Sequence, residues 1–387
     1  MGLRQSLGLF MRPMTLELGI SAATFGFAIA VQNIVWGLSQ PVVGALADRY
    51  GPRPVLIATA LAYAVGLLLM VFAKAVPAGL EIAGFLVGIG AAGTGFGVLI
   101  GVVSRATPPE KRTKMVGIVA AAGSLGTLAI APLGQGLIDG FGWKAAMVAF
   151  AAIAASMALL SFPIREQPLA GVNPAAVNKN LRQAVREAMS HRGYLFMILA
   201  FFACGFQLVF ITTHLPAYLE LCGIAPGVGA SALALIGLFN AVGTYIFGLL
   251  GARYSAKHLL ALIYLLRTFF IAVFLLVPID SASTLVFAAA MGFLWLGVVP
   301  LVTGIIGRVF GLAHFNTLYG IAFLSHQLGS FFGAWMGGVV FDRMGNYNFA
   351  WGALIVIGVT AFMLQWLMDE RPPRERSSVG QPAAALA

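Results

Sequence analysis

Long apolar stretches separated by short polar gaps run along almost the whole chain. A helix that crosses a bilayer needs about 20 apolar residues. Eleven stretches meet that length, at 17–45, 54–74, 79–104, 113–138, 143–163, 193–218, 228–251, 258–278, 283–306, 315–338 and 349–368. No stretch alternates apolar and polar residues as a membrane barrel strand does. The pattern therefore predicts an all-α polytopic membrane protein.

The composition leads to the same class. Of 387 residues, 60% are hydrophobic and only 9% are charged, whereas a soluble domain carries about a quarter charged residues. This excludes a soluble enzyme, a nucleic-acid module and a disordered chain. The net charge of +10 does not indicate nucleic acid, because the basic residues are spread through short gaps and form no solvated cluster.

The cysteines and acidic residues predict no metal, disulfide or cofactor. Cys204 and Cys222 would lie about 27 Å apart on one helix, too far for a disulfide bond. No spacing typical of metal ligands occurs, and no clustered nucleophile or acid–base pair suggests catalysis. We therefore expect no enzyme activity.

Lys and Arg are concentrated in alternate gaps, which sets an expected orientation. The positive-inside rule places the central loop 164–192 and the carboxyl-terminal tail in the cytoplasm. We expect a multi-pass protein of the cell inner membrane, whose only large partner is the lipid bilayer, and a monomer. The tail, 371–387, is rich in Pro, Ser and Ala and is predicted to be disordered, although a lipid-binding role stays open.

An internal repeat divides the chain into two halves. Residues 44–53 recur at 248–257, an offset of 204, in glycine, leucine, arginine, tyrosine and a final cation. A second match at an offset of 203 joins Leu125, Gly126, Gly134, Asp139 and Gly142 to Leu328, Gly329, Gly337, Asp342 and Gly345. Such repeats are typical of transporters. The predicted units are a helix bundle at 1–163, the loop 164–192, a second bundle at 193–370 and the tail 371–387.

The repeat predicts an incomplete first helix. The partner of 193–218 would begin before Met1, and what remains matches Gly2 with Gly205 and Pro13 with Pro216. Residues 1–13 are thus expected to be the stub of a twelfth helix, first in order, before eleven full spans. A protein of eleven true spans is the alternative.

The segment Gly44-Ala-Leu-Ala-Asp48-Arg49-Tyr-Gly51-Pro-Arg53 resembles the loop signature of the major facilitator superfamily. That resemblance implies two six-helix bundles around a central cavity, with alternating access between the two sides. It also implies a gating role for this segment, in which Asp48 is part of a cytoplasmic latch, with simple loop solvation as the alternative. The echo at 248–257 keeps Arg253 but has Ala252 in place of the acid.

Three stretches resemble bacterial members of the monocarboxylate and oxalate/formate branch. They are Gly2 to Ser6, Thr213 to Tyr218 and Phe323 to Gly329. Monocarboxylate porters commonly carry an Asp/Arg pair in helix 8, but 228–251 offers only Asn240 and Tyr245 as comparable polar residues. That proton-coupling device is therefore expected to be absent.

The polar residues predicted deep in the membrane are cationic or neutral. Asp and Glu lie at or beyond the ends of the predicted spans, and a charge buried in a bilayer is a functional hypothesis by default. Arginine can hold a carboxylate by two parallel hydrogen bonds, so the pattern favours an anionic substrate. The candidate binding residues are Arg4, Asn33, Gln207, Asn240, Arg267, Trp295, His326 and Gln327.

Several of these residues keep a structural alternative. Arg267 is as compatible with a bond to neighbouring backbone, and His326 and Asn33 with links between helices. Trp295 is compatible with ordinary packing. His214, near Pro216, is expected to gate or pack rather than to bind.

The predicted function is a secondary transporter of a small organic anion, a mono- or dicarboxylate, coupled to a proton or a counter-anion. The alternative within transport is an exporter of drug-like compounds, which the scarcity of deep acids disfavours. Two alternatives come from other classes. One is a membrane sensor, but the tail is too short to contain the signalling domain that a sensor would need. The other is a membrane-embedded enzyme.

Overall fold

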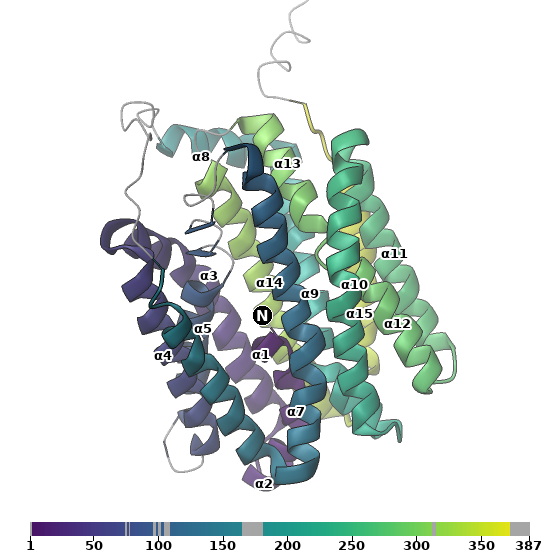
Figure 1. Ribbon diagram of the computed structural model, residues 1–387. Coiled ribbons are helices and arrows are strands. Elements are labelled where there is room, and N and C mark those ends of the chain that lie inside the picture. The colour runs from purple at the N-terminus through teal and green to yellow at the C-terminus, as the bar shows by residue number, and fades with distance from the viewer. Residues whose placement is uncertain are drawn as a thin grey trace, which may run out of the picture.

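Helices form the described part of the chain. A computed structural model describes residues 2–73, 76, 78–95, 98, 99, 102, 103, 109–164, 181–311 and 315–371, and within these ranges no strand occurs. In Figure 1, α3, α4 and α5 stand on one side and α10, α11, α12 and α15 on the other, with α7, α9 and α14 between them. The predicted all-α class is confirmed.

The elements follow the apolar stretches of the sequence. The first half contains α1 (Gly2–Gln5), the 3-10 helix η1 (Leu7–Phe10), α2 (Met11–Leu18), α3 (Ala22–Tyr50), α4 (Pro52–Val71), α5 (Gly79–Thr94) and α7 (Pro109–Leu160). The second half contains α9 (Arg192–Leu221), α10 (Pro226–Arg253), α11 (Ala256–Leu276), α12 (Ser281–Phe293), α13 (Val298–Phe310), α14 (Phe315–Met344) and α15 (Asn348–Trp366). Between them, α8 (Leu181–Ser190) lies within the predicted central loop.

Eight helices among the described residues are long and apolar enough to cross a membrane, and Gly79–Thr94 is a shorter apolar helix. Two of the predicted spans, 113–138 and 143–163, both belong to α7 and are separated by Gly142, whose φ of 81° is not helical. The predicted span 283–306 consists of two shorter helices, α12 and α13. The count of eleven full spans stays a prediction.

The boundary between the stub and the next helix corrects the sequence analysis. The predicted span 17–45 begins at Ala22, and the stub continues to Leu18. Pro13 does not end the stub, because it lies in the first turn of α2, where a missing N–H costs little. The chain turns instead at Gly19, whose φ is 67°, and α3 starts after Ser21, whose hydroxyl accepts the Thr24 N–H.

The repeat seen in the sequence is present in the packing. A Cβ placed at Gly88 would lie 2.6 Å from the carbonyl oxygen of Gln32, where α5 crosses α3. A Cβ placed at Gly292 would lie 2.8 Å from the carbonyl oxygen of Ile236, where α12 crosses α10. Both members of the second pair follow the first by the offset of 204, so the same glycine-dependent crossing occurs in each half.

The most extensive contacts between the two halves are along two helix pairs, α3 with α14 and α7 with α10, and η1 also packs on α9. The helices α3 and α14 run antiparallel: Gly338 packs on Ala22, and a Cβ at Gly26 would lie 2.5 Å from the Ala334 oxygen. On the other pair, a Cβ at Gly237 would lie 2.8 Å from the Cβ of Thr127. Small residues bring the backbones together, as is usual between membrane helices.

Candidate functional site

Four of the predicted binding residues form one hydrogen-bonded cluster between the halves. Arg4 of α1 donates through Nη1 to Oδ1 of Asn33 in α3, at 3.0 Å. Gln327 of α14 donates through Nε2 to the Asn33 carbonyl oxygen at 2.9 Å. Nδ1 of His326 lies 3.1 Å from Oε1 of Gln327, so this nitrogen carries the proton. The cluster connects the first half of the chain to the second.

The guanidinium of Arg4 has unused hydrogen-bonding capacity. The residue is half-buried, and its Nε is buried without a hydrogen-bond partner. Among the described side chains, no ion pair with a carboxylate involves Arg4. A buried donor without an acceptor is costly, and a bound anion would supply both the acceptor and the opposite charge.

A chain of aromatic contacts begins at this guanidinium, and the sequence analysis did not identify its rings as site residues. The Arg4 Cζ lies 4.9 Å from the centroid of the Trp36 ring. The Trp36 ring meets Phe323 of α14 edge to face at 5.3 Å, and Phe323 stacks on His326 at 6.0 Å. Trp36 follows Asn33 by three positions and Phe323 precedes His326 by three. Helical spacing, which places such residues on one face, was the signal that could have found them.

Gln207 does not join the cluster. Its Nε2 donates to the Leu354 carbonyl oxygen at 3.1 Å, and its side chain packs against Gly358 of α15. On the same helix, Gly205 contacts the backbone of His326. Residues two positions apart on a helix are separated by about 200° of rotation. Gln207 therefore faces away from α14 and from Arg4.

Arg267 and Asn240 hold the break between α12 and α13. Arg267 donates to the Leu294 carbonyl oxygen through Nε at 3.1 Å and through Nη2 at 2.6 Å, and Nη2 also contacts the Trp295 carbonyl. Asn240 Oδ1 accepts the Leu296 N–H at 3.0 Å. Helix ends leave backbone groups without intrahelical partners, and these side chains satisfy them.

The break thus gathers three predicted binding residues in a second cluster. The side chain of Trp295 is fully buried, as is that of Arg267. Asn240 extends the contacts across the halves, because its Nδ2 donates to the Ser124 hydroxyl of α7 at 3.0 Å. The Nη1 atom of Arg267 is buried without a hydrogen-bond partner.

Three of the predicted gating residues lie where α3 and α10 end. Gly51 and Arg53 follow α3, and Arg253 is the last residue of α10. Gly51 joins α3 to α4 with φ 86° and ψ 155°, a conformation open essentially to glycine. The guanidinium of Arg53 lies 5.1 Å from the Phe162 ring, and that of Arg253 lies 5.8 Å from the Tyr254 ring.

Three further gating candidates are Asp48, Arg49 and His214. Asp48 and Arg49 belong to α3, but their side chains lie outside the described residues. His214 packs α9 against α14: Nε2 lies 2.7 Å from the Ala334 oxygen, and Nδ1 lies 3.3 Å from the Tyr347 hydroxyl.

The described contacts between the halves differ along α3. At the Ala22 end of α3, Arg12 of α2 forms a 3.1 Å ion pair with Glu220 of α9. Toward the Tyr50 end, a Cβ at Gly37 still meets the Gln327 side chain at 2.9 Å. Seven positions further on each antiparallel helix, Gly44 and Gly320 have no described atom within 4 Å of an added Cβ. An added Cβ therefore meets the opposite helix at Gly37 but meets open space at Gly44 and Gly320.

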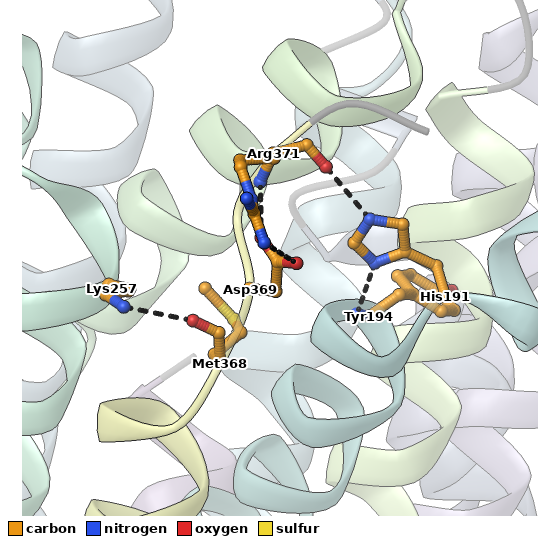
Figure 2. A network of polar contacts seen from close by, with 6 residues as sticks. All are labelled: His191, Tyr194, Lys257, Met368, Asp369 and Arg371. Atoms are coloured by element: carbon orange, nitrogen blue, oxygen red, sulfur yellow. Dashed lines mark hydrogen bonds and ion pairs between the residues drawn. The ribbon is translucent and has the colours of Figure 1, made fainter. Parts of the chain in front are cut away.

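A polar network at the end of α15 ties the second half together (Figure 2). His191 caps α9, accepting the Tyr194 N–H at 3.3 Å, and its Nε2 donates to the Arg371 oxygen at 3.0 Å. Lys257 of α11 donates to the Met368 oxygen at 3.1 Å. Arg308 of α13 pairs with Glu370 at 3.1 Å. The polar groups of this network are paired with one another, so we assign the network a structural role.

Comparison with known proteins agrees with this architecture. The family described as Major Facilitator Superfamily matches residues 1–334. Monocarboxylate transporter 13 of Rattus norvegicus is 26% identical over 94% of this chain and 83% of its own. The oxalate:formate antiporter of Oxalobacter formigenes is 24% identical over 94% of this chain and 85% of its own. The xylose transporter XylE from E. coli, in an inward-open conformation, has a similar fold, with a TM-score of 0.70, 17% identity and coverage of 95% and 90%.

Proposed function

Because the chain belongs to the Major Facilitator Superfamily, we propose that this membrane transporter carries a small organic monocarboxylate across the cytoplasmic membrane by alternating access. The observation that carries the proposal is the half-buried Arg4 guanidinium between the halves, with a buried Nε that has no acceptor. A substrate carboxylate suits this guanidinium, because it can accept two parallel N–H bonds from one guanidinium.

The number of cations supports one carboxylate rather than two. Arg267, the other deep arginine, is fully buried and directs Nε and Nη2 to backbone carbonyls. Among the described residues, Arg4 is thus the arginine in the cluster formed with Asn33, His326 and Gln327. A dianion would leave its second charge in a poorly solvating environment, which is costly.

The names of the relatives include this substrate class. One is a monocarboxylate transporter, and the other is an antiporter named for oxalate, a dicarboxylate, and formate, a monocarboxylate. They leave the coupling open, so either a proton or a counter-anion would accompany the substrate. Antiport would suit a site whose Arg4 needs an anion in both directions of the cycle.

In the proposed transport cycle, the two halves close together alternately at the Ala22 end and at the Tyr50 end of α3. The contacts near Ala22 hold one end closed, while Gly44 and Gly320 stand in open space at the other. The basic gaps of the sequence favour a cytoplasmic position for the Tyr50 end. Closing that end would bring the signature segment at Asp48 and Arg49 toward the second half, where Asp48 would serve as a latch.

Uptake into proteoliposomes tests the proposal. Labelled acetate, lactate, benzoate and oxalate would be offered with and without an inward proton gradient, and with and without unlabelled anion inside. We expect a monocarboxylate to be taken up, with Arg4→Gln as the inactive control. Stimulation by internal anion alone would identify exchange, and stimulation by the gradient alone would identify proton symport. Uptake of none of the acids, together with efflux of an apolar cation such as ethidium, would instead support the exporter alternative.

A further inference from the structure

The walls around Arg4 are aromatic on both sides of the boundary between the halves. Trp36 comes from α3 and lies 4.9 Å, ring centroid to Cζ, from the Arg4 guanidinium. Phe323 comes from α14 and meets the Trp36 ring at 5.3 Å and 75°. Tyr319, one turn earlier on α14, stacks on Phe323 at 6.3 Å. Aromatic surface therefore extends from the Arg4 guanidinium across the boundary between the halves.

The distances restrict where the body of a bound anion can lie. A carboxylate that accepts the free Nε–H must approach to about 3 Å of the guanidinium. The atoms attached to that carboxylate then come within van der Waals reach of Trp36, since its ring is already against the same guanidinium. Aromatic surfaces favour flat π-systems, through offset or edge-to-face contacts, over saturated groups of equal size.

The rings also lie near the part of α3 and α14 where an added Cβ meets open space. Gly37 follows Trp36 directly and still contacts Gln327 of α14, whereas Gly44 and Gly320 have open space around them. Phe323 and Tyr319 are only half-buried. A ligand that entered from the Tyr50 end would meet these rings beside Arg4, so they are placed to select among carboxylates.

We propose that the transported monocarboxylate carries a flat, conjugated ring, with its carboxylate on Arg4 and its ring against Trp36 and Phe323. This rests on the proposed function, because it assumes that Arg4 holds a carboxylate. Each ring contact is expected to give about a threefold to tenfold preference for a flat ring over a saturated one.

The test uses two probes of the same charge and nearly the same size, benzoate and cyclohexanecarboxylate. Isothermal titration calorimetry on the full chain in lipid nanodiscs gives the affinity ratio of benzoate to cyclohexanecarboxylate. We expect the parent to bind benzoate about tenfold more tightly. Trp36→Leu and Phe323→Leu should each bring the ratio toward one, because they weaken benzoate binding more than cyclohexanecarboxylate binding.

The chain supplies a matched control at the other end of the same helix pair. Phe27 of α3 and Trp335 of α14 form an edge-to-face pair at 5.7 Å and 64°, so Phe27→Leu and Trp335→Leu remove equivalent aromatic packing away from Arg4. These variants should keep the parent's ratio. They also control for loss of folding, which thermal unfolding would report for all four.

Three results overturn the inference, and they separate it from the proposed function. Equal affinity for both probes, or a ratio that Trp36→Leu and Phe323→Leu do not change, removes the ring preference. In the first two cases the proposed function can still hold. If Arg4→Gln then binds neither probe, the proposal that Arg4 holds a carboxylate stands. If neither probe binds the parent, both proposals fail.

Discussion

The carboxylate of Asp342 caps the amino-terminal end of α3, where its Oδ1 accepts the backbone N–H of Ala22 at 3.1 Å. Its Oδ2 accepts the N–H of Ala23 at 2.7 Å. Asp342 belongs to α14 of the second half, so a charge in one half satisfies the free amides of a helix in the other. Its repeat counterpart Asp139 makes no equivalent cap: it accepts the Gln135 amide at 2.8 Å, and α10 starts without a side-chain cap.

This asymmetry predicts that Asp342→Asn weakens closure at the Ala22 end. Removing a charge from a helix amino terminus costs about 1 kcal/mol, or a shift of about fivefold in the population of closed and open forms. Spin labels at Leu16 and Met344, which are 73% and 54% exposed, would report the separation at this end by pulsed electron resonance. The background is Cys222→Ser, because Cys222 is exposed.

In that experiment we expect a longer and broader distance for Asp342→Asn. Asp139→Asn is the matched control, since it removes the same charge at the equivalent repeat position without removing a cap. Identical distributions for the parent and Asp342→Asn would show that the cap does not govern closure.

Arg4→Gln is predicted to lower substrate affinity by about tenfold to a hundredfold, because a charged hydrogen bond contributes about 1.5–3 kcal/mol. Arg4→Lys should lose part of the same affinity, since an ammonium cannot make the two parallel bonds of a guanidinium. Binding would be measured with the best substrate from the uptake panel. Parent-like affinity in Arg4→Gln would place the anion elsewhere, with Arg267 the next residue to test.

Arg267→Gln is predicted to act on stability instead of affinity. It removes the charged donors from the Leu294 and Trp295 carbonyls at the helix break, a loss of about 1.5–3 kcal/mol. In a Cys222→Ser background, the buried Cys204 becomes accessible to a fluorogenic maleimide on unfolding. The melting temperature should fall, while the folded fraction should bind substrate as the parent does. A stable Arg267→Gln protein that has lost substrate binding would contradict the capping role.

Two glycines of one signature segment are predicted to respond differently to alanine. Gly51→Ala forces a side chain into φ 86° and ψ 155°, which costs about 1–3 kcal/mol, so the melting temperature should fall. Gly44→Ala should leave stability unchanged or slightly raised, because Gly44 is helical with no described atom near its Cβ and alanine favours a helix by about 1 kcal/mol. Transport should slow in Gly44→Ala, since closure brings α3 and α14 together. Full transport in that variant would mean that the two helices never approach there.

The sequence predicted what depends on apolar length and on the repeat. The membrane helices follow the apolar runs, and the offset of 204 reappears in the crossings at Gly88 and Gly292. What it missed depends on direction around a helix axis. Gln207 was grouped with Arg4 because both were predicted to lie deep in the membrane. Depth does not set the face of a helix, and the Gln207 side chain points to α15.

Two further features lay beyond the pattern for different reasons. The break between Leu294 and Gly297 sits inside one unbroken apolar run, and hydropathy does not distinguish a continuous helix from two short ones. Trp36 and Phe323 were overlooked because aromatic residues are common in this chain, with 29 phenylalanines, and only their contacts across the halves distinguish them. The polar residues around Arg4 were candidates because polar residues are rare in the predicted spans.

The open space beside Gly44 and Gly320 has a pharmacological consequence. A compound that filled it would keep α3 and α14 apart and stop the cycle without occupying Arg4. Its inhibition would be noncompetitive with substrate and would arise only from the membrane face that bears Tyr50, which sided addition to vesicles can measure. Resistance by a bulkier residue at either glycine would itself obstruct the approach of the two helices, so few escape mutations at these positions would leave a working carrier.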